Sequence, residues 1–463
     1  MSDLRKEHPD FVEMKSRWEM CEHAAEGEHA VHKEGTKYLP KLKDEDDDSY
    51  ALRLRMTPFF NATWRTISGM RGMLFRKPPL VEMSPAMEQL CENIDLAGTT
   101  VRGLSQEVVE EALKLGRVGL LVDHPITPPG TTLADAARLS LRPFISVYEA
   151  ASIYNWKETR SNGVVSLNQV RLLEKVTVDK EDEFASATED RYRVLDLKDG
   201  KYRQRLYRIA EDGSEQQLGG DIFPTMQGKP LDFIPFIVVG VDCVGMDVDA
   251  PPLIDLVSTN FHHYLQATSY ERGCFFSGLP TMFISGMEDS DGEISIGGQV
   301  ANALGSPNAK AYYVEVSSKF EALRTNLEDK KREMAVLGAR MLEGGKNTGG
   351  VEAAETVARR QSGEESVLAA MAETVSQGLT KALGWVALWV GDKSPVSYAL
   401  NKDFLPQAMT AQDLTSLVSA WQNGAISQET LFDNLKAGEI VADATTFEDE
   451  QARISTSGPF FSG

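Results

Sequence analysis

Residues 318–342 read SKFEALRTNLEDKKREMAVLGARML, a stretch in which apolar side chains recur at alternating steps of three and four residues. The positions on this spacing are Phe320, Leu323, Leu327, Lys330, Met334, Leu337 and Met341. Such a seam, here with one lysine in it, is typical of a helix that packs lengthwise against another helix. At 1.5 Å per residue the predicted helix is about 37 Å long.

The preceding segments predict a partner for this helix and a β-rich insertion between the two. After Pro251-Pro252, residues 253–274 carry apolar side chains at helical spacing, so they form the predicted partner helix. Residues 275–315 revert to short strand-like runs between glycine turns: LPTMFISG, EISIGG and AYYVEV. The chain therefore predicts a helix, a small β-rich insertion and a second helix.

The segment that follows combines a glycine-rich loop with another long helix. GGKNTGG, residues 344–350, has four glycines in seven residues. It is either an ordinary turn between antiparallel helices or a loop that changes shape while presenting Lys346, Asn347 and Thr348. Residues 352–390 are predicted to be helical. The apolar stripe of this helix consists of Leu368, Met371, Val375, Leu379, Ala382 and Val386.

The remaining chain alternates between helical and β-rich segments. Further helices are expected over 7–34, over 50–75 up to the prolines of RKPP, and over 105–115, 411–422 and 428–437. VGLLV at 118–122 is short and apolar, as expected of a buried strand. Residues 142–240 predict several strands, with the strongest hairpin signal at Asp199-Gly200. The predicted fold class is α+β, mainly helical.

Composition limits the function. The 463 residues include 48 Lys and Arg against 69 Asp and Glu, a formal net charge of −21. This balance argues against a protein that holds nucleic acid by neutralising phosphates, although it is compatible with one past which nucleic acid must slide. No apolar run is long enough to span a bilayer, the N-terminus lacks an apolar signal region, and the four cysteines form no CxxC pair. We expect a reduced, cytoplasmic site of synthesis.

Three groups of residues could in principle bind a metal, and each fails on geometry. Cys21, His23, His29 and His32 have the spacing C-x-H-x5-H-x2-H, which matches no zinc pattern. The acidic run 44–48 lacks the glycine and the distal glutamate of a calcium loop, so we expect it to cap the following helix. His262 and His263 diverge by about 100° on a helix, so only one can face the apolar side. We therefore predict no metal and no cofactor.

Motifs of enzymes are absent from the sequence. It contains no GxxxxGK[ST] phosphate loop, no GxSxG, no HExxH and no paired CxxC. An enzyme of unknown chemistry stays an alternative, and it would require a deep pocket with paired titratable residues. We predict no catalytic residues.

Six phrases along nearly the whole chain resemble tailed-bacteriophage portal proteins, particularly a compact family from short-tailed phages. In the N-terminal half they are RMTPFFNATWRTISGMRGMLFRKPP (55–79), EEALKLGRVGLLVDHP (110–125) and RPFISVYEAASIYNW (142–156). In the C-terminal half they are PPLIDLVSTNFHHYLQATSYERGCFFSGLPTMFISG (251–286), YYVEVSSKFEALRTNLEDKKREMAVLGARML (312–342) and NGAISQETLFDNLKAGEI (423–440). The resemblance depends on the order of these six phrases more than on any single phrase.

The resemblance implies a ring, usually of twelve subunits, at one capsid vertex, through which double-stranded DNA is packaged and ejected. By position it implies a wing at 1–250, a first stem helix at 251–274, a clip at 275–315, a second stem helix at 316–343, a tunnel loop at 344–351, a long wing helix at 352–392 and a helical crown at 400–463. The clip and the crown are both short for this family. The implied partners are the major capsid protein, the terminase large subunit, and head–tail adaptor or tail proteins.

Two sets of site residues follow from this resemblance. Lys346, Asn347 and Thr348 of the tunnel loop would face the DNA. The seam would contact neighbouring subunits through Phe320, Leu323, Leu327, Met334, Leu337 and Met341. The protein is expected in the virion after synthesis in the bacterial host cytoplasm. The main alternative is another ring-forming virion protein, such as a head–tail adaptor.

Overall fold

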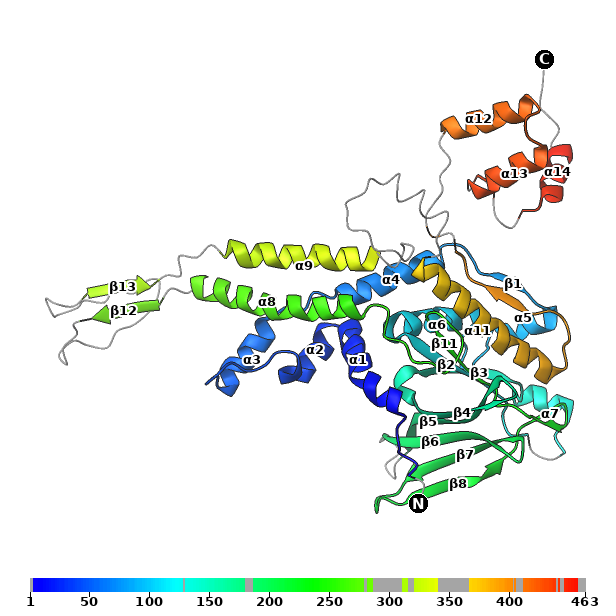
Figure 1. The fold of residues 1–463 in the computed structure, drawn as a ribbon, viewed down its shortest axis with the longest axis horizontal. Coiled ribbons are helices and arrows are strands. Elements are labelled where there is room, and N and C mark those ends of the chain that lie inside the picture. The colour runs from blue at the N-terminus through cyan, green and yellow to red at the C-terminus, as the bar shows by residue number, and fades with distance from the viewer. Residues whose placement is uncertain are drawn as a thin grey trace. The chain divides into compact units, whose positions relative to one another are not determined.

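The computed structural model describes residues 3–127, 130–179, 186–278, 281–285, 310–314, 320–339, 366–402, 404, 411–438, 440–441 and 445–456. The chain forms two compact units (Figure 1). The first comprises Met1–Gly72 and Pro79–Leu400, and the second comprises Met73–Pro78 and Asn401–Gly463. The longer segment of the second unit coincides with the predicted crown, whereas the predicted wing and stem belong to the first unit except for Met73–Pro78.

A three-stranded antiparallel sheet forms the core of the first unit. Its order is β11 (Phe236–Gly240), β2 (Arg117–Asp123) and β3 (Phe144–Glu149). Every residue of the central strand β2 is buried, which confirms the buried strand predicted at 118–122. Helices α6 (Val101–Leu115) and α11 (Val367–Val390) both pack against this sheet. The predicted apolar stripe of α11 is completely buried there, because it faces β2 and β11.

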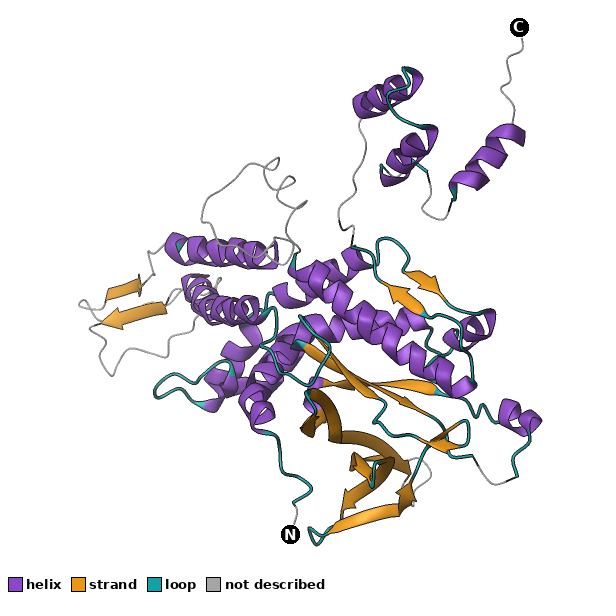
Figure 2. Ribbon diagram, turned by 45° about the vertical axis from the view of Figure 1, so that its right-hand side comes forward, coloured by secondary structure: helices purple, strands orange, loops and turns teal. Residues whose placement is uncertain are grey.

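A second sheet, which lies between β3 and β11 along the chain, is a five-stranded antiparallel meander (Figure 2). Its strands are β4 (Ile153–Ser161), β5 (Val164–Asp179), β6 (Ser186–Lys198), β7 (Lys201–Ile209) and β8 (Glu215–Ile222). The hairpin predicted at Asp199-Gly200 joins β6 to β7. Both turn residues have positive φ, 53° and 71°, as a type I′ turn requires.

The N-terminal helices are shorter than predicted. The helix expected over 7–34 is broken into α1 (Pro9–Glu26) and α2 (Glu28–Glu34), because Gly27 adopts a φ of 95°. The stretch expected over 50–75 is likewise divided into α3 (Asp47–Met56) and α4 (Ala62–Leu74). Pro58 explains this break, since the residue before a proline is disfavoured in helical geometry and Thr57 is extended.

Smaller elements complete the first unit. They are η1 (Gly35–Lys37), β1 (Leu80–Glu82), α5 (Pro85–Cys91), α7 (Leu133–Arg138), η2 (Ala150–Ser152), β9 (Thr225–Met226), β10 (Lys229–Pro230) and β14 (Ser397–Ala399). The second unit contains α12 (Ala411–Gln422), α13 (Gln428–Ala437) and α14 (Phe447–Thr456). As predicted, α12 and α13 are helical, and Ser427 caps α13 by accepting a hydrogen bond from the amide of Thr430.

The predicted helix–insertion–helix arrangement is present in the first unit. Helix α8 (Ile254–Gly278) is followed by the antiparallel strands β12 (Thr281–Ser285) and β13 (Lys310–Val314) and then by α9 (Glu321–Ala339). Helix α9 begins three residues later than predicted, since Phe320 has a φ of 48°. Helix α11 begins at Val367, because Ser366 is extended and caps it, and residues 352–365 of the predicted helix lie outside the described residues. The tunnel loop predicted at 344–351 and the seam residue Met341 lie outside the described residues.

No helix within the described parts of the chain is both long and apolar enough to cross a membrane.

The contact of α11 with the core sheet makes a testable prediction. A methyl group on Gly378 would collide with the Cγ2 atom of Val239 on β11, whereas the corresponding position at Gly384 has no atom within 4 Å. We expect Gly378→Ala to reduce the free energy of unfolding by about 1–3 kcal/mol through overpacking. Gly384→Ala, in the same helix, should stabilise by about 0.5–1 kcal/mol. Urea denaturation of both variants checks this, and equal effects would contradict the packing described.

Candidate functional site: the helix pair α8 and α9

Helices α8 and α9 lie side by side and antiparallel, with the β12–β13 hairpin at their far end (Figures 1 and 2). The predicted seam of α9 explains the pairing. Leu327 is 8% exposed and Met334 is 2% exposed. Met334 forms a small cluster with Leu256 and Ala62, and Leu337 packs against its edge.

The seam therefore contributes to packing within one chain. Phe320, Leu323 and Leu337 are only half-buried there. Contact of these residues with a neighbouring subunit stays a prediction. A substitution at Leu327 would perturb the helix pair itself, so it could not report on assembly alone.

Glycines allow close packing at both ends of the pair. A Cβ atom on Gly273 of α8 would lie 2.7 Å from the ring of Phe320, which precedes α9. A Cβ atom on Gly338 of α9 would lie 3.1 Å from Thr66 of α4. The two helices and α4 can approach this closely because neither glycine carries a side chain.

A buried amide joins α8 to the N-terminus of α4. The Oδ1 atom of Asn260 accepts hydrogen bonds from the backbone amides of Ala62 (3.2 Å) and Thr63 (3.3 Å) and from the Thr63 hydroxyl (3.1 Å). Its Nδ2 atom donates to the carbonyl of Phe60 (2.8 Å). Asn260 thus satisfies amides at the start of α4 that have no partner within that helix.

His263 is buried one turn further along α8, while the adjacent His262 is exposed. This confirms that only one of the two histidines faces the apolar side. Within the described chain neither ring nitrogen of His263 has a hydrogen-bond partner. Burial lowers the pKa of His263 to about 4, and the nearby ammonium groups of Lys331 and Lys330 contribute to this shift.

Residues 252–390 match the family model described as a domain of unknown function (DUF4055). The match starts just before α8 and ends at the last residue of α11, so the unit that it recognises is the helix pair, its insertion and α11. It covers well under half of the chain. No curated protein matches the chain.

Several solved structures contain similar chains. One is "Neck of empty GTA particle computed with C6 symmetry", with 12% identity and a TM-score of 0.39 over 89% of this chain and 94% of that chain. Another is "Neck of native GTA particle computed with C12 symmetry", with 13% identity and a TM-score of 0.38 over 82% and 91%. "Virion of native gene transfer agent (GTA) particle" gives 13% identity and 0.36 over 92% and 98%. TM-scores below 0.5 assign neither a fold nor a role to this chain.

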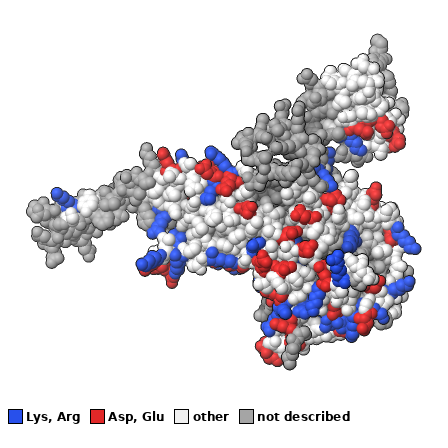
Figure 3. All heavy atoms as spheres, in the orientation of Figure 1, with Lys and Arg blue, Asp and Glu red and all other residues white. Residues whose placement is uncertain are grey.

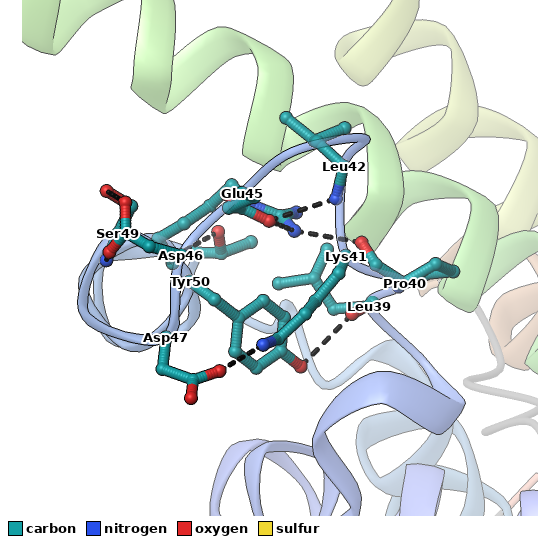
Figure 4. Close-up of polar contacts among 11 residues, drawn as sticks. Leu39, Pro40, Lys41, Leu42, Glu45, Asp46, Asp47, Ser49 and Tyr50 are labelled. Carbon is teal, nitrogen blue, oxygen red and sulfur yellow. Dashed lines mark hydrogen bonds and ion pairs between the residues drawn. The ribbon is translucent and has the colours of Figure 1, made fainter.

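The acidic run 44–48 caps a helix, as predicted (Figure 4). Asp46 accepts a hydrogen bond from the backbone amide of Ser49 at 2.8 Å, in the first turn of α3. Glu45 forms a two-pronged ion pair with the buried Arg53, with N–O distances of 2.8 and 2.7 Å. These hydrogen bonds lower the pKa of Glu45 to about 2. The acidic run therefore stabilises α3 and the loop that precedes it.

The predicted metal candidates Cys21, His23, His29 and His32 do not come together at one site. The imidazole of His32 lies 2.9 Å from the carbonyl oxygen of Thr57, and that of His23 lies 2.8 Å from the hydroxyl of Tyr38. Cys21 is buried, and burial raises the pKa of its thiol to about 12. The hydrogen-bonding contacts of His32 and His23 and the burial of Cys21 are typical of residues that stabilise the fold.

A different cluster, which the sequence analysis missed, does form there. Potential ligand atoms of Glu19, His23 and Glu34 lie within 4.8 Å of one another. The four-residue spacing of Glu19 and His23 on α1 was visible in the sequence, but Glu34 joins them only because α2 turns back at Gly27. The ammonium of Lys37 lies 2.7 Å from Glu19 and 3.9 Å from Glu34, so a cationic side chain already contacts both carboxylates.

The buried histidine makes stability depend on pH. Above pH 6.5 His263 is neutral in both the folded and the unfolded chain. Between pH 6.5 and about 4 the unfolded chain takes up the proton first, so stability is lost across this range, by at most about 3 kcal/mol. We expect the melting temperature to fall less between pH 7 and 4.5 in His263→Leu than in the wild type. His262→Leu, the exposed control, should behave like the wild type, and identical losses in all three would contradict this assignment.

The Lys37 contacts predict that the protein does not depend on a metal. Neither EDTA nor added zinc should change the melting temperature, because Lys37 already forms ion pairs with the carboxylates of Glu19 and Glu34. Differential scanning fluorimetry measures this directly. A drop in melting temperature with EDTA that zinc reverses would overturn the assignment.

Proposed function

We propose that this chain is a structural protein of a phage-like virion, and specifically a portal protein that forms a ring at one capsid vertex. The observation that carries the proposal is the order α8, β12–β13, α9. Two antiparallel helices extend from an α/β body and bear a β-hairpin at their far end (Figure 1). This order corresponds to the stem and clip implied by the sequence resemblance.

The attachment of the helix pair to the body supports the same proposal. Helix α8 follows β11 along the chain, and α11, which comes after α9, packs back onto β11 through the Gly378–Val239 contact. The chain thus leaves the core sheet, builds the helix pair and returns to the same sheet. The helix pair is thus connected to the core sheet at both of its chain ends. Such a pair can transmit force to the body, as a channel through which DNA is driven requires.

The charge distribution suits a conduit for double-stranded DNA. Acidic and basic side chains are interspersed on the face shown in Figure 3, which carries no broad basic surface. Twelve copies would have a formal charge of 12 × (−21) = −252. Because each neutralised phosphate adds affinity, a strongly acidic ring favours sliding over retention.

The proposal includes the partners named by the resemblance. These are the major capsid protein, the terminase large subunit, head–tail adaptor or tail proteins, and DNA in transit. The location is the virion, after synthesis in the host cytoplasm. A head–tail adaptor is the second candidate, since it would also form a ring.

Cryo-electron microscopy of the purified full chain tests the proposal. A portal should give a ring, expected to be a dodecamer, in which α8 and α9 surround an axial channel. A ring without helices around its channel would favour an adaptor. A monomer or dimer would overturn both candidates and favour an enzyme.

The proposed tunnel loop gives a genetic prediction. Lys346, with Asn347 and Thr348, would place one cationic ring in an otherwise acidic channel. Lys346→Glu should leave the ring assembled but reduce packaging yield or DNA retention, because phosphates would meet added negative charge. Lys201→Glu, at the exposed first residue of β7, is the matched control. Normal packaging by a phage that carries Lys346→Glu would contradict the proposed contact of this loop with DNA.

A further inference from the structure

A buried guanidinium at the start of the central strand β2 has no hydrogen-bond partner. Arg117 is 1% exposed, and within the described chain none of its three side-chain nitrogens finds an acceptor. Its guanidinium carbon lies 4.7 Å from the ring centre of Trp156, a cation–π contact that replaces only part of the lost hydration. Buried charges in proteins are normally paired and hydrogen-bonded, so this side chain requires an explanation.

Three carboxylates lie close enough to act on this guanidinium. Burial lowers the pKa of Arg117 to about 10, and the negative charges of Asp10, Asp247 and Asp249 act in the opposite direction. Asp10 belongs to the first turn of α1, where its carboxylate lies 3.6 Å from the Nδ1 atom of His8. Asp247 and Asp249 belong to the loop between β11 and α8, and within the described chain neither carboxylate has a hydrogen bond or an ion pair.

The loop between β11 and α8 passes directly beside Arg117. A Cβ atom on the preceding Gly116 would lie 3.3 Å from the carbonyl oxygen of Ala250, the residue that follows Asp249. Asp249 is half-buried, whereas Asp247 is exposed. Asp249 is therefore the carboxylate best placed to reach the guanidinium.

Residues 247–250 form a short strap between two buried anchors. Met246 is 6% exposed, and Pro251 is also buried. The carbonyl of Pro251 accepts a hydrogen bond of 3.1 Å from the amide of Ile254, the first residue of α8. A movement of the strap is therefore small, and it acts on the start of α8.

We propose that the strap closes over Arg117, so that the carboxylate of Asp249 forms a two-pronged ion pair with the guanidinium and fixes the start of α8. Arg117 is already removed from water in the open form, so only the half-buried Asp249 loses further hydration on closure. The pair gains charge-assisted hydrogen bonds, because the planar guanidinium matches the geometry of a carboxylate. Closure occurs within a single chain and does not depend on the proposed ring.

A double-mutant cycle in the full chain tests the ion pair. Asp249→Asn should lower the melting temperature by several degrees, because it leaves the buried cation without its partner. The same change in an Arg117→Met background should have no effect. Asp247→Asn, in the same strap, is the matched control and should have no effect in either background. Equal effects of Asp249→Asn in the two backgrounds, or coupling of Arg117 to Asp247 instead, would overturn the proposal.

Hydrogen–deuterium exchange gives a readout that does not require the Arg117→Met variant to fold. Asp249→Asn should speed exchange in the strap and in the first turn of α8, over residues 247–257, and should leave the β6–β7 hairpin unchanged. Exchange at the wild-type rate would contradict closure of the strap. Faster exchange confined to residues 247–250 would contradict its effect on α8.

Discussion

The buried amide of Asn260 holds the projecting helix pair to the body of the protein. Two helices share a single seam and cannot build a core of their own, so their position depends on what fixes their base. Asn260 is completely buried and bonds to Phe60, Ala62 and Thr63 at the start of α4. Without it, the buried amide of Thr63 would lose its partner, at a cost of about 1–3 kcal/mol, whereas the amide of Ala62 also donates to the carbonyl of Phe60 at 2.7 Å.

Close steric fit extends this attachment into the core. Gly338 brings α9 against α4, Gly273 admits the ring of Phe320, and Gly378 brings α11 onto Val239 of β11. Each contact leaves no room for a methyl group without movement of its neighbour. The helix pair and the core sheet are thus connected through interfaces that resist sliding, because packed interiors are dense and have low compressibility.

These features agree with the structural role proposed above. Two acidic groups in the described residues already contact a basic side chain: Lys37 forms ion pairs with Glu19 and Glu34, and Arg53 pairs with Glu45.

Local patterns in the sequence were sufficient to predict several helices and turns. The three- and four-residue spacing predicted α9, the apolar stripe predicted α11, and Asp199-Gly200 predicted the β6–β7 turn, since each depends on residues close together in the chain. Tertiary structure alone decided that Asn260 caps a helix some 200 residues earlier, that Glu34 joins Glu19 and His23, and that α3 and α8 enclose a pocket. These features depend on which distant segments pack together, and no local periodicity encodes that choice.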